Sequence, residues 1–147
     1  MSKYRVLQLT NGTVGAVAIN EFMPLGNITR RVQEDCGGYP TFNVTTSQAD
    51  TVYLNEVGNY DVTYSASLTP GAAGELTVAL IANGTQVYAV SVTAVSGDVV
   101  NVTLPYQVRV CPNCASTPTN CPMTIQLQLT GVAVTAGQTN LLIERVY

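Results

Sequence analysis

The four cysteines are the residues of this chain whose type and spacing could bind a metal or form covalent links. They are Cys36, Cys111, Cys114 and Cys121. Cys111 and Cys114 form a CxxC pair, and four thiolates together could build a closed tetrahedral zinc site. The second CxxC pair of a strong zinc motif is missing, so reduced thiols and disulfides, with three possible pairings, stay open as alternatives. A redox role lacks support, because a redox CxxC normally opens a helix and this one lies in a proline-rich loop between predicted strands.

Other groups that catalysis requires are missing from the sequence. There is no histidine, which excludes Ser-His-Asp and Cys-His catalysis and every histidine-ligated metal site. No glycine-rich phosphate loop and no P-loop lysine occurs. Glu34, Asp35 and Asp98 could act as acids or bases, but sequence neighbours on a strand point to opposite faces and make no pair. The sequence therefore predicts a protein that is not an enzyme, with no catalytic residue and no cofactor beyond a structural zinc.

Composition and charge narrow the class of protein further. The chain has 147 residues, 46% of them hydrophobic and only 10% charged, which favours one folded domain over a disordered chain. Its net charge of -3 argues against binding to nucleic acid. We find neither a predominantly apolar stretch of about 20 residues nor a signal-peptide pattern. We therefore expect no membrane segment and synthesis in a cytoplasm.

Alternating apolar and polar residues predict that the chain is built from β-strands. In residues 60–68, apolar side chains face one way and polar side chains the other, as in a strand with one buried face. Asn83-Gly84 is a favoured type I′ hairpin turn, because both central residues of that turn need positive φ. Pro105 lies within the strand predicted for residues 100–110 and cannot donate to a ladder, which indicates an edge position or a bulge.

The number and spacing of the predicted strands indicate the architecture. About eight strands follow residue 40 at spacings of roughly ten residues, which is typical of a sandwich or barrel. The predicted fold is an all-β, antiparallel jelly-roll sandwich; the rival immunoglobulin sandwich lacks its Cys-Trp-Cys signature. Glycines interrupt the pattern before residue 40, so we predict an extended N-terminal arm at 1–38 and a jelly-roll head at 39–147. The alternative is that residues 1–38 are extra strands of the same domain.

The strand pattern resembles that of C1q/TNF-like jelly rolls. The run GNYDVTYSAS at residues 58–67 resembles their G-x-Y-x-V-x-Y-x-A strand, and residues 76–87, with Asn83-Gly84 at the tip, resemble the hairpin that follows. Residues 97–100 and the closing strand at 140–147 match in order and spacing. With its N-terminal part, the whole chain is similar to the small C1q/TNF-like virion proteins of tailed gut phages, including crAss-like ones. The cysteine loop departs from this pattern.

The resemblance implies a homotrimeric head fibre or capsid decoration on the capsid surface of a virion. It implies the following trimer-interface residues: Tyr60, Tyr64, Leu142 and Tyr147. The alternative for each of them is a place in the core of a single chain. Alternation puts Leu142 and Tyr147 on opposite faces, so both reach the threefold axis only if the strand bends. The basic residues of the arm would attach to a major or auxiliary capsid protein: Lys3, Arg5, Arg30 and Arg31.

Two other functions are compatible with the same sequence features. One is a phage tail or receptor-binding tip, in which exposed Tyr and Asn side chains of the end loops could contact a host-surface glycan. The other is a C1q-like extracellular recognition module, although the sequence shows no signal peptide, collagen-like stalk or partner domain.

Overall fold

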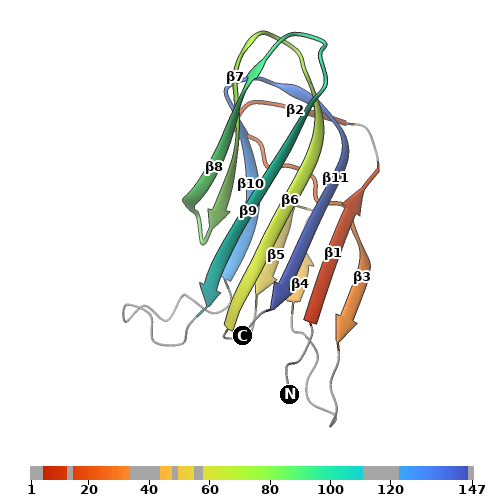
Figure 1. Ribbon diagram of the computed structural model, residues 1–147, viewed down its shortest axis with the longest axis vertical. Helices are drawn as coiled ribbons and strands as arrows, with labels where there is room; N and C mark the ends of the chain where they lie inside the picture. Colours follow the sequence, from red (N-terminus) through yellow and green to blue (C-terminus); the bar gives the residue numbers. More distant parts are fainter. Residues whose placement is uncertain are drawn as a thin grey trace.

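Two antiparallel β-sheets packed face to face make up this protein (Figure 1). The structure is a computed structural model that describes residues 5–12, 15–33, 44–47, 50–54, 58–110 and 123–145. The strands are β1 (Arg5–Asn11), β2 (Gly15–Val17), β3 (Asn27–Gln33), β4 (Val44–Ser47), β5 (Thr51–Leu54), β6 (Gly58–Pro70), β7 (Gly74–Ala82), β8 (Thr85–Ala94), β9 (Val100–Val110), β10 (Met123–Thr130) and β11 (Val134–Arg145). Within these ranges there is no helix that is long and apolar enough to cross a membrane.

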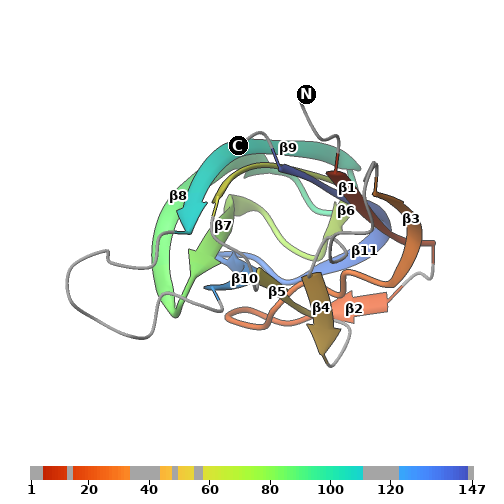
Figure 2. The same cartoon turned by 90° about the horizontal axis from the view of Figure 1, so that it is seen from below.

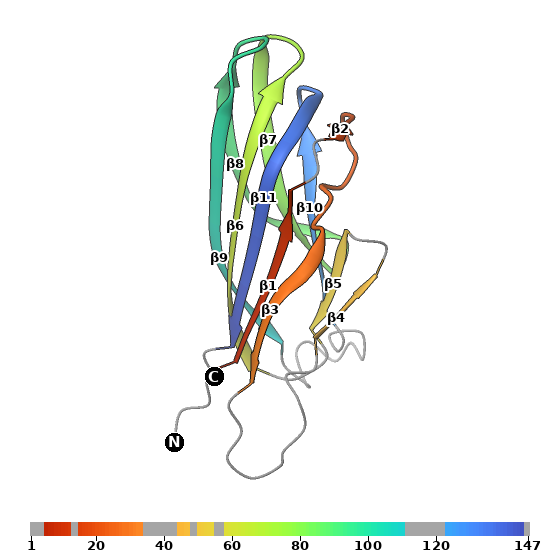
Figure 3. The same cartoon turned by 90° about the vertical axis from the view of Figure 1, so that its right-hand side faces the viewer.

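The eleven described strands are divided between two sheets, A and B. Sheet A runs β3-β1-β11-β6-β9, and β2 also pairs with β11; sheet B runs β4-β5-β10-β7-β8. Figure 2, seen from below, shows the two sheets on opposite sides of the core, with the edge strands β8 and β9 next to each other. The side view in Figure 3 shows strands of both sheets rising from the end where β1 begins and β11 ends. The predicted all-β, antiparallel jelly roll is confirmed.

Strand β6 shows why this sequence forms a sandwich. Its polar residues are partly exposed, whereas Tyr60, Val62, Tyr64 and every second residue after them are buried. The inward side chains pack against those of sheet B, such as Leu80 and Leu127, in one hydrophobic cluster. Apolar and polar side chains alternate along β6 because only one face of the strand is buried, as the sequence predicts.

Two local predictions about turns and edges are also confirmed. Asn83 and Gly84 both have positive φ, 50° and 78°, in the turn between β7 and β8. Pro105 lies opposite Thr63 in β9, which is an edge strand of sheet A, so no ladder donor is lost in the middle of a sheet. The rings of Tyr88 in β8 and Tyr106 in β9 stack with centroids 5.4 Å apart and join the two edges.

The N-terminal third departs from the predicted arm, because β1, β2 and β3 are strands of the sandwich itself. Strand β1 is an interior strand of sheet A, paired with β3 on one side and with β11 on the other. Its Leu7 and Leu9 are buried, as are Met23 and Leu25 farther along. In the described residues, the division at residue 38 therefore does not separate an arm from a head, and the alternative of extra strands in one domain is what the structure shows.

The last strand is longer than the sequence indicates. It begins at Val134 rather than near residue 140, and it carries an irregularity in register between Ala136 and Thr139. One extra residue of β11 at this point shifts the inward positions from Val134 and Ala136 to Thr139, Leu141 and Ile143.

Candidate functional site

Two of the four predicted trimer-interface residues lie inside the core. Tyr60 and Tyr64 are both 0% exposed, because they are on the inward face of β6 and sheet B covers them. In this fold no partner subunit can contact these side chains. The prediction that they line a threefold axis is therefore corrected: they are core residues of a single chain.

The Tyr64 side chain is an unusual core residue, because its hydroxyl has no hydrogen-bond partner among the described residues. Burial raises the pKa of the Tyr64 phenol above its ordinary value of 10.0, and the nearby Thr139 hydroxyl offsets part of that rise. The Thr139 hydroxyl donates to the Pro24 carbonyl oxygen at 3.3 Å, and its geometry toward Tyr64 Oη does not satisfy a hydrogen bond. We therefore treat the phenol as buried, neutral and unsatisfied.

The other two predicted interface residues have different outcomes. Leu142 lies on the outer face of sheet A, opposite Gln8 of β1 and Thr63 of β6, and is only partly buried. It is therefore available to a partner. Tyr147 lies outside the described residues.

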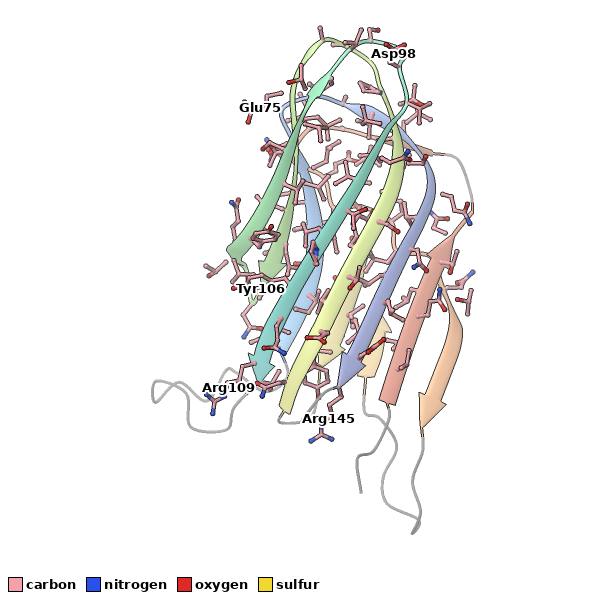
Figure 4. The ribbon with its side chains drawn as sticks, in the orientation of Figure 1. Glu75, Asp98, Tyr106, Arg109 and Arg145 are labelled. Atoms are coloured by element: carbon pink, nitrogen blue, oxygen red, sulfur yellow. The ribbon has the colours of Figure 1, made fainter. Side chains whose placement is uncertain are left out.

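The predicted capsid-anchoring residues lie on strands of sheet A, with one exception. Arg5 begins β1, and Arg30 and Arg31 are in β3, opposite Gln8 and Leu7; Lys3 lies outside the described residues. The register brings Arg145 of β11 directly opposite Arg5. Arg109 lies near the end of β9, and Figure 4 shows it at the same end of the molecule as Arg145.

The grouping of these arginines at one end follows from strand pairing and not from the sequence. Arg109 and Arg145 are far from Arg5 in sequence, and nothing in their local pattern groups them. The antiparallel pairing of β1 with β11 and of β6 with β9 brings all three to the end that carries the termini.

The four candidate zinc ligands, Cys36, Cys111, Cys114 and Cys121, lie outside the described residues. Among the residues that the structure does describe, no group of three or more His, Cys, Asp or Glu side chains could hold a metal ion. A structural zinc bound by the cysteines therefore stays a prediction.

A depression on the outer face of sheet A was not predicted from the sequence. Its volume is about 430 Å³. It is lined by Ser65, Ala66, Ser67, Asn101, Val102, Thr103, Gln138, Thr139 and Asn140. Short serines on the central strand β6 lie between longer amides on β9 and β11, and Ser67 Oγ donates to Asn101 Oδ1 at 2.9 Å. The lining is uncharged and suits hydrogen bonds with neutral polar groups.

The strand order and the faces of both sheets define a jelly roll of the TNF/C1q kind. No family model and no curated protein matches the chain in sequence. Among solved structures, Eiger TNF from S. frugiperda is similar with a TM-score of 0.69 and 7% identity, over 100% of this chain and 94% of that chain. The globular domain of zebrafish complement 1qA protein has a TM-score of 0.64 and 7% identity, over 97% and 98% of the two chains.

A phage protein is similar in fold as well. The PRD1 vertex protein P5 has a TM-score of 0.57 and 14% identity, over 100% of this chain and 74% of that chain. Identities this low show the fold alone.

Proposed function

We propose that this chain is a structural protein of a phage virion, a homotrimeric head fibre or capsid decoration. The likeness of the whole chain to jelly rolls that include a phage capsid vertex protein carries this proposal. The chemistry of the described residues agrees with it, because they offer an uncharged depression on the outer face of sheet A and an arginine-bearing end. That the phage is crAss-like is part of the same proposal and rests on the sequence resemblance alone.

The outer face of sheet A is the surface that we assign to the trimer contact. Leu142 lies there beside Thr63 and Gln8, near the uncharged depression described above. A stable subunit contact buries about 800 Å² per partner, which the outer face of four long neighbouring strands can supply. Tyr60 and Tyr64 would then support the interface only from beneath, as core residues of β6.

The mass of the full chain in solution tests the trimer. We expect light scattering to give three times the 15.5 kDa mass of the chain. Leu142→Asp should yield folded monomers, because an unpaired charge in an interface costs about 3–5 kcal/mol. Val87→Asp, at a partly exposed residue of the edge strand β8, is the matched control and should remain trimeric. A monomeric wild-type chain would refute the homotrimer.

A separate experiment tests the virion role and the anchoring end. Peptides of this chain should be found by mass spectrometry in intact particles from a culture that carries its gene, after banding on a density gradient. Replacing Arg5, Arg30 and Arg31 by Gln should release the protein from particles at lower salt, because attachment of arginines to an acidic surface is screened by salt. Recovery of the chain only in the soluble fraction would contradict the proposal.

The likeness to TNF and C1q domains favours a second candidate function, a recognition module or a receptor-binding tip. In that case the chain would bind a host-surface glycan or protein without being fixed to a capsid. The particle experiment separates the two, since a secreted recognition module would be absent from banded particles.

A further inference from the structure

The end of the sandwich opposite the termini is formed by two connections that are held together. One joins β6 to β7 at residues 71–73, and the other joins β8 to β9 at residues 95–99. The Gly97 N–H donates to the Pro70 carbonyl oxygen at 2.9 Å, and Ser96 Oγ donates to the Gly71 carbonyl oxygen at 3.4 Å. The two loops therefore present one continuous surface rather than two separate ones (Figures 1 and 4).

We call this region the distal surface, and apart from its glycines and Ser96 its exposed residues are Ala72, Ala73, Glu75, Val95, Asp98 and Val99. Val95 and Val99 are 54% and 61% exposed, more than any other large hydrophobic side chain in the described part of the chain. Exposed apolar side chains gathered at one point, with polar residues around them, typify an interaction site. Ala72 and Ala73 in the neighbouring loop are exposed as well, and Glu75 and Asp98 are carboxylates at the same end of the molecule.

Among the described residues, no lysine or arginine lies at the same end of the molecule as the carboxylates of the distal surface. All the lysines and arginines of the sequence are at positions 3, 5, 30, 31, 109 and 145. The pairing of the strands brings the five described ones toward the end with the termini, as Figure 4 shows for Arg109 and Arg145 on one side and Glu75 and Asp98 on the other. The distal surface is therefore apolar and anionic.

The backbone beneath this surface is closely packed, so the surface is preorganised. Gly131, in the turn between β10 and β11, has a φ of 89°, and a Cβ at this position would collide with the Glu75 carbonyl oxygen. The Gly71 N–H donates to the Ala133 carbonyl oxygen at 2.9 Å, which connects the same turn to the β6–β7 loop. A surface that is already ordered loses little conformational entropy when it binds a partner.

We propose that the distal surface binds a protein partner that presents an apolar contact ringed by Lys or Arg side chains. The two valines supply the dry centre of the contact, and Glu75 and Asp98 supply rim charges that attract and orient a basic partner. An anionic membrane or a nucleic acid would be repelled by the same carboxylates. The inference rests on the proposed function for one point, which is that the opposite end is attached to a capsid and the distal surface projects outward. Three copies of the distal surface in a trimer would then add avidity.

A titration with a designed peptide tests the distal surface. The probe is a synthetic amphipathic helix of leucines and lysines, added to the full chain with isotope-labelled valine methyl groups. The methyl signals of Val95 and Val99 should shift and saturate, while that of Val87, which is 37% exposed near the opposite end, should not. Peptides with serine in place of leucine, or glutamate in place of lysine, should bind at least about tenfold more weakly.

Variants of the chain complete the test. Val95→Ser with Val99→Ser, and Glu75→Gln with Asp98→Asn, should each weaken binding of the leucine–lysine peptide about tenfold. The matched controls Val87→Ser and Asp61→Asn should bind as the wild type does. Unchanged binding in both distal pairs, or shifts at Val87 as large as those at Val95, would overturn the proposal.

Light scattering on the same samples keeps the two proposals distinguishable. A monomeric chain that binds the peptide through Val95 and Val99 supports the distal surface and contradicts the trimer. A trimer whose valine methyl signals do not respond overturns the distal surface and leaves the trimer intact.

Discussion

The Tyr64 hydroxyl is the group in which burial and hydrogen bonding conflict most clearly. It is enclosed between the sheets without a hydrogen-bond partner among the described residues, while the ring fills the core. A buried, unsatisfied hydroxyl costs free energy, whereas the aromatic ring stabilises the fold by burying a large apolar area. Selection for size, rather than for a hydroxyl contact, explains this residue in the core.

We therefore predict that Tyr64→Phe leaves the chain as stable at pH 7 as the wild type, or more stable by about 1 kcal/mol. The raised pKa adds a pH dependence. Stability linked to Tyr64 is fully present below pH 10, the pKa of the unfolded phenol, and is lost as the pH rises above 10, because only the unfolded phenol ionises readily. Urea midpoints at pH 7 and above pH 10 measure both effects.

The control for Tyr64→Phe is Val62→Ala, a core truncation on the same strand face without a titratable group. It should lower stability by the same amount at both pH values. A clear loss of stability in Tyr64→Phe at pH 7 would show that the hydroxyl has a partner and that the assignment as unsatisfied is wrong.

At the scale of elements, β1 explains why the N-terminal residues cannot be a detachable arm. The strand pairs with β3 on one side and β11 on the other, and its removal would expose the edge of β11 and part of the core. Edge strands with free ladder groups are aggregation-prone, so loss of β1 affects solubility as well as stability.

The contribution of β1 to the stability of the chain can be measured at one residue. Leu7→Ala should destabilise the chain by about 2–5 kcal/mol, as core leucine truncations do, and deletion of residues 1–38 should abolish folding. Ile19→Ala, at a 48%-exposed residue of the same N-terminal region, is the control and should change stability by no more than about 0.5 kcal/mol. A deletion variant that still folds and trimerises would restore the arm hypothesis.

At the scale of the whole molecule, the two ends of the sandwich differ in chemistry. One end has the start of β1, the end of β11 and the described arginines, and the other has the apolar, anionic distal surface. Such a division suits a protein that is attached at one end and meets a partner at the other, with the flat outer face of sheet A between the two ends for subunit contacts.

The homotrimer predicts a property of the assembled molecule that no single residue has. If folding is coupled to association, the Tm of the wild-type chain should rise with protein concentration by mass action. Scans by circular dichroism over a hundredfold range of concentration would measure this rise, and Leu142→Asp should remove it. A Tm of the wild-type chain that does not depend on concentration would argue against coupled assembly.

Most of the local structure followed from the amino-acid sequence. Period-two alternation in β6, the Asn83-Gly84 turn and the edge position of Pro105 depend on backbone geometry within a few residues, and all three were predicted correctly. The alternation in the last strand likewise separated Leu142 from Leu141 and Ile143. Part of the candidate site was missed, because the tyrosines of β6 were predicted at an interface although sheet B covers them.

The sequence by itself determined the all-β class and the strand faces, because side-chain alternation and turn chemistry act over short distances along the chain. Only the tertiary structure decided that β1 joins β11 about 130 residues away, that Arg5, Arg109 and Arg145 share one end, and that Val95 and Val99 share the other. The reason is physical: pairing across long chain separations is selected by the packing of a whole core, which no local pattern contains.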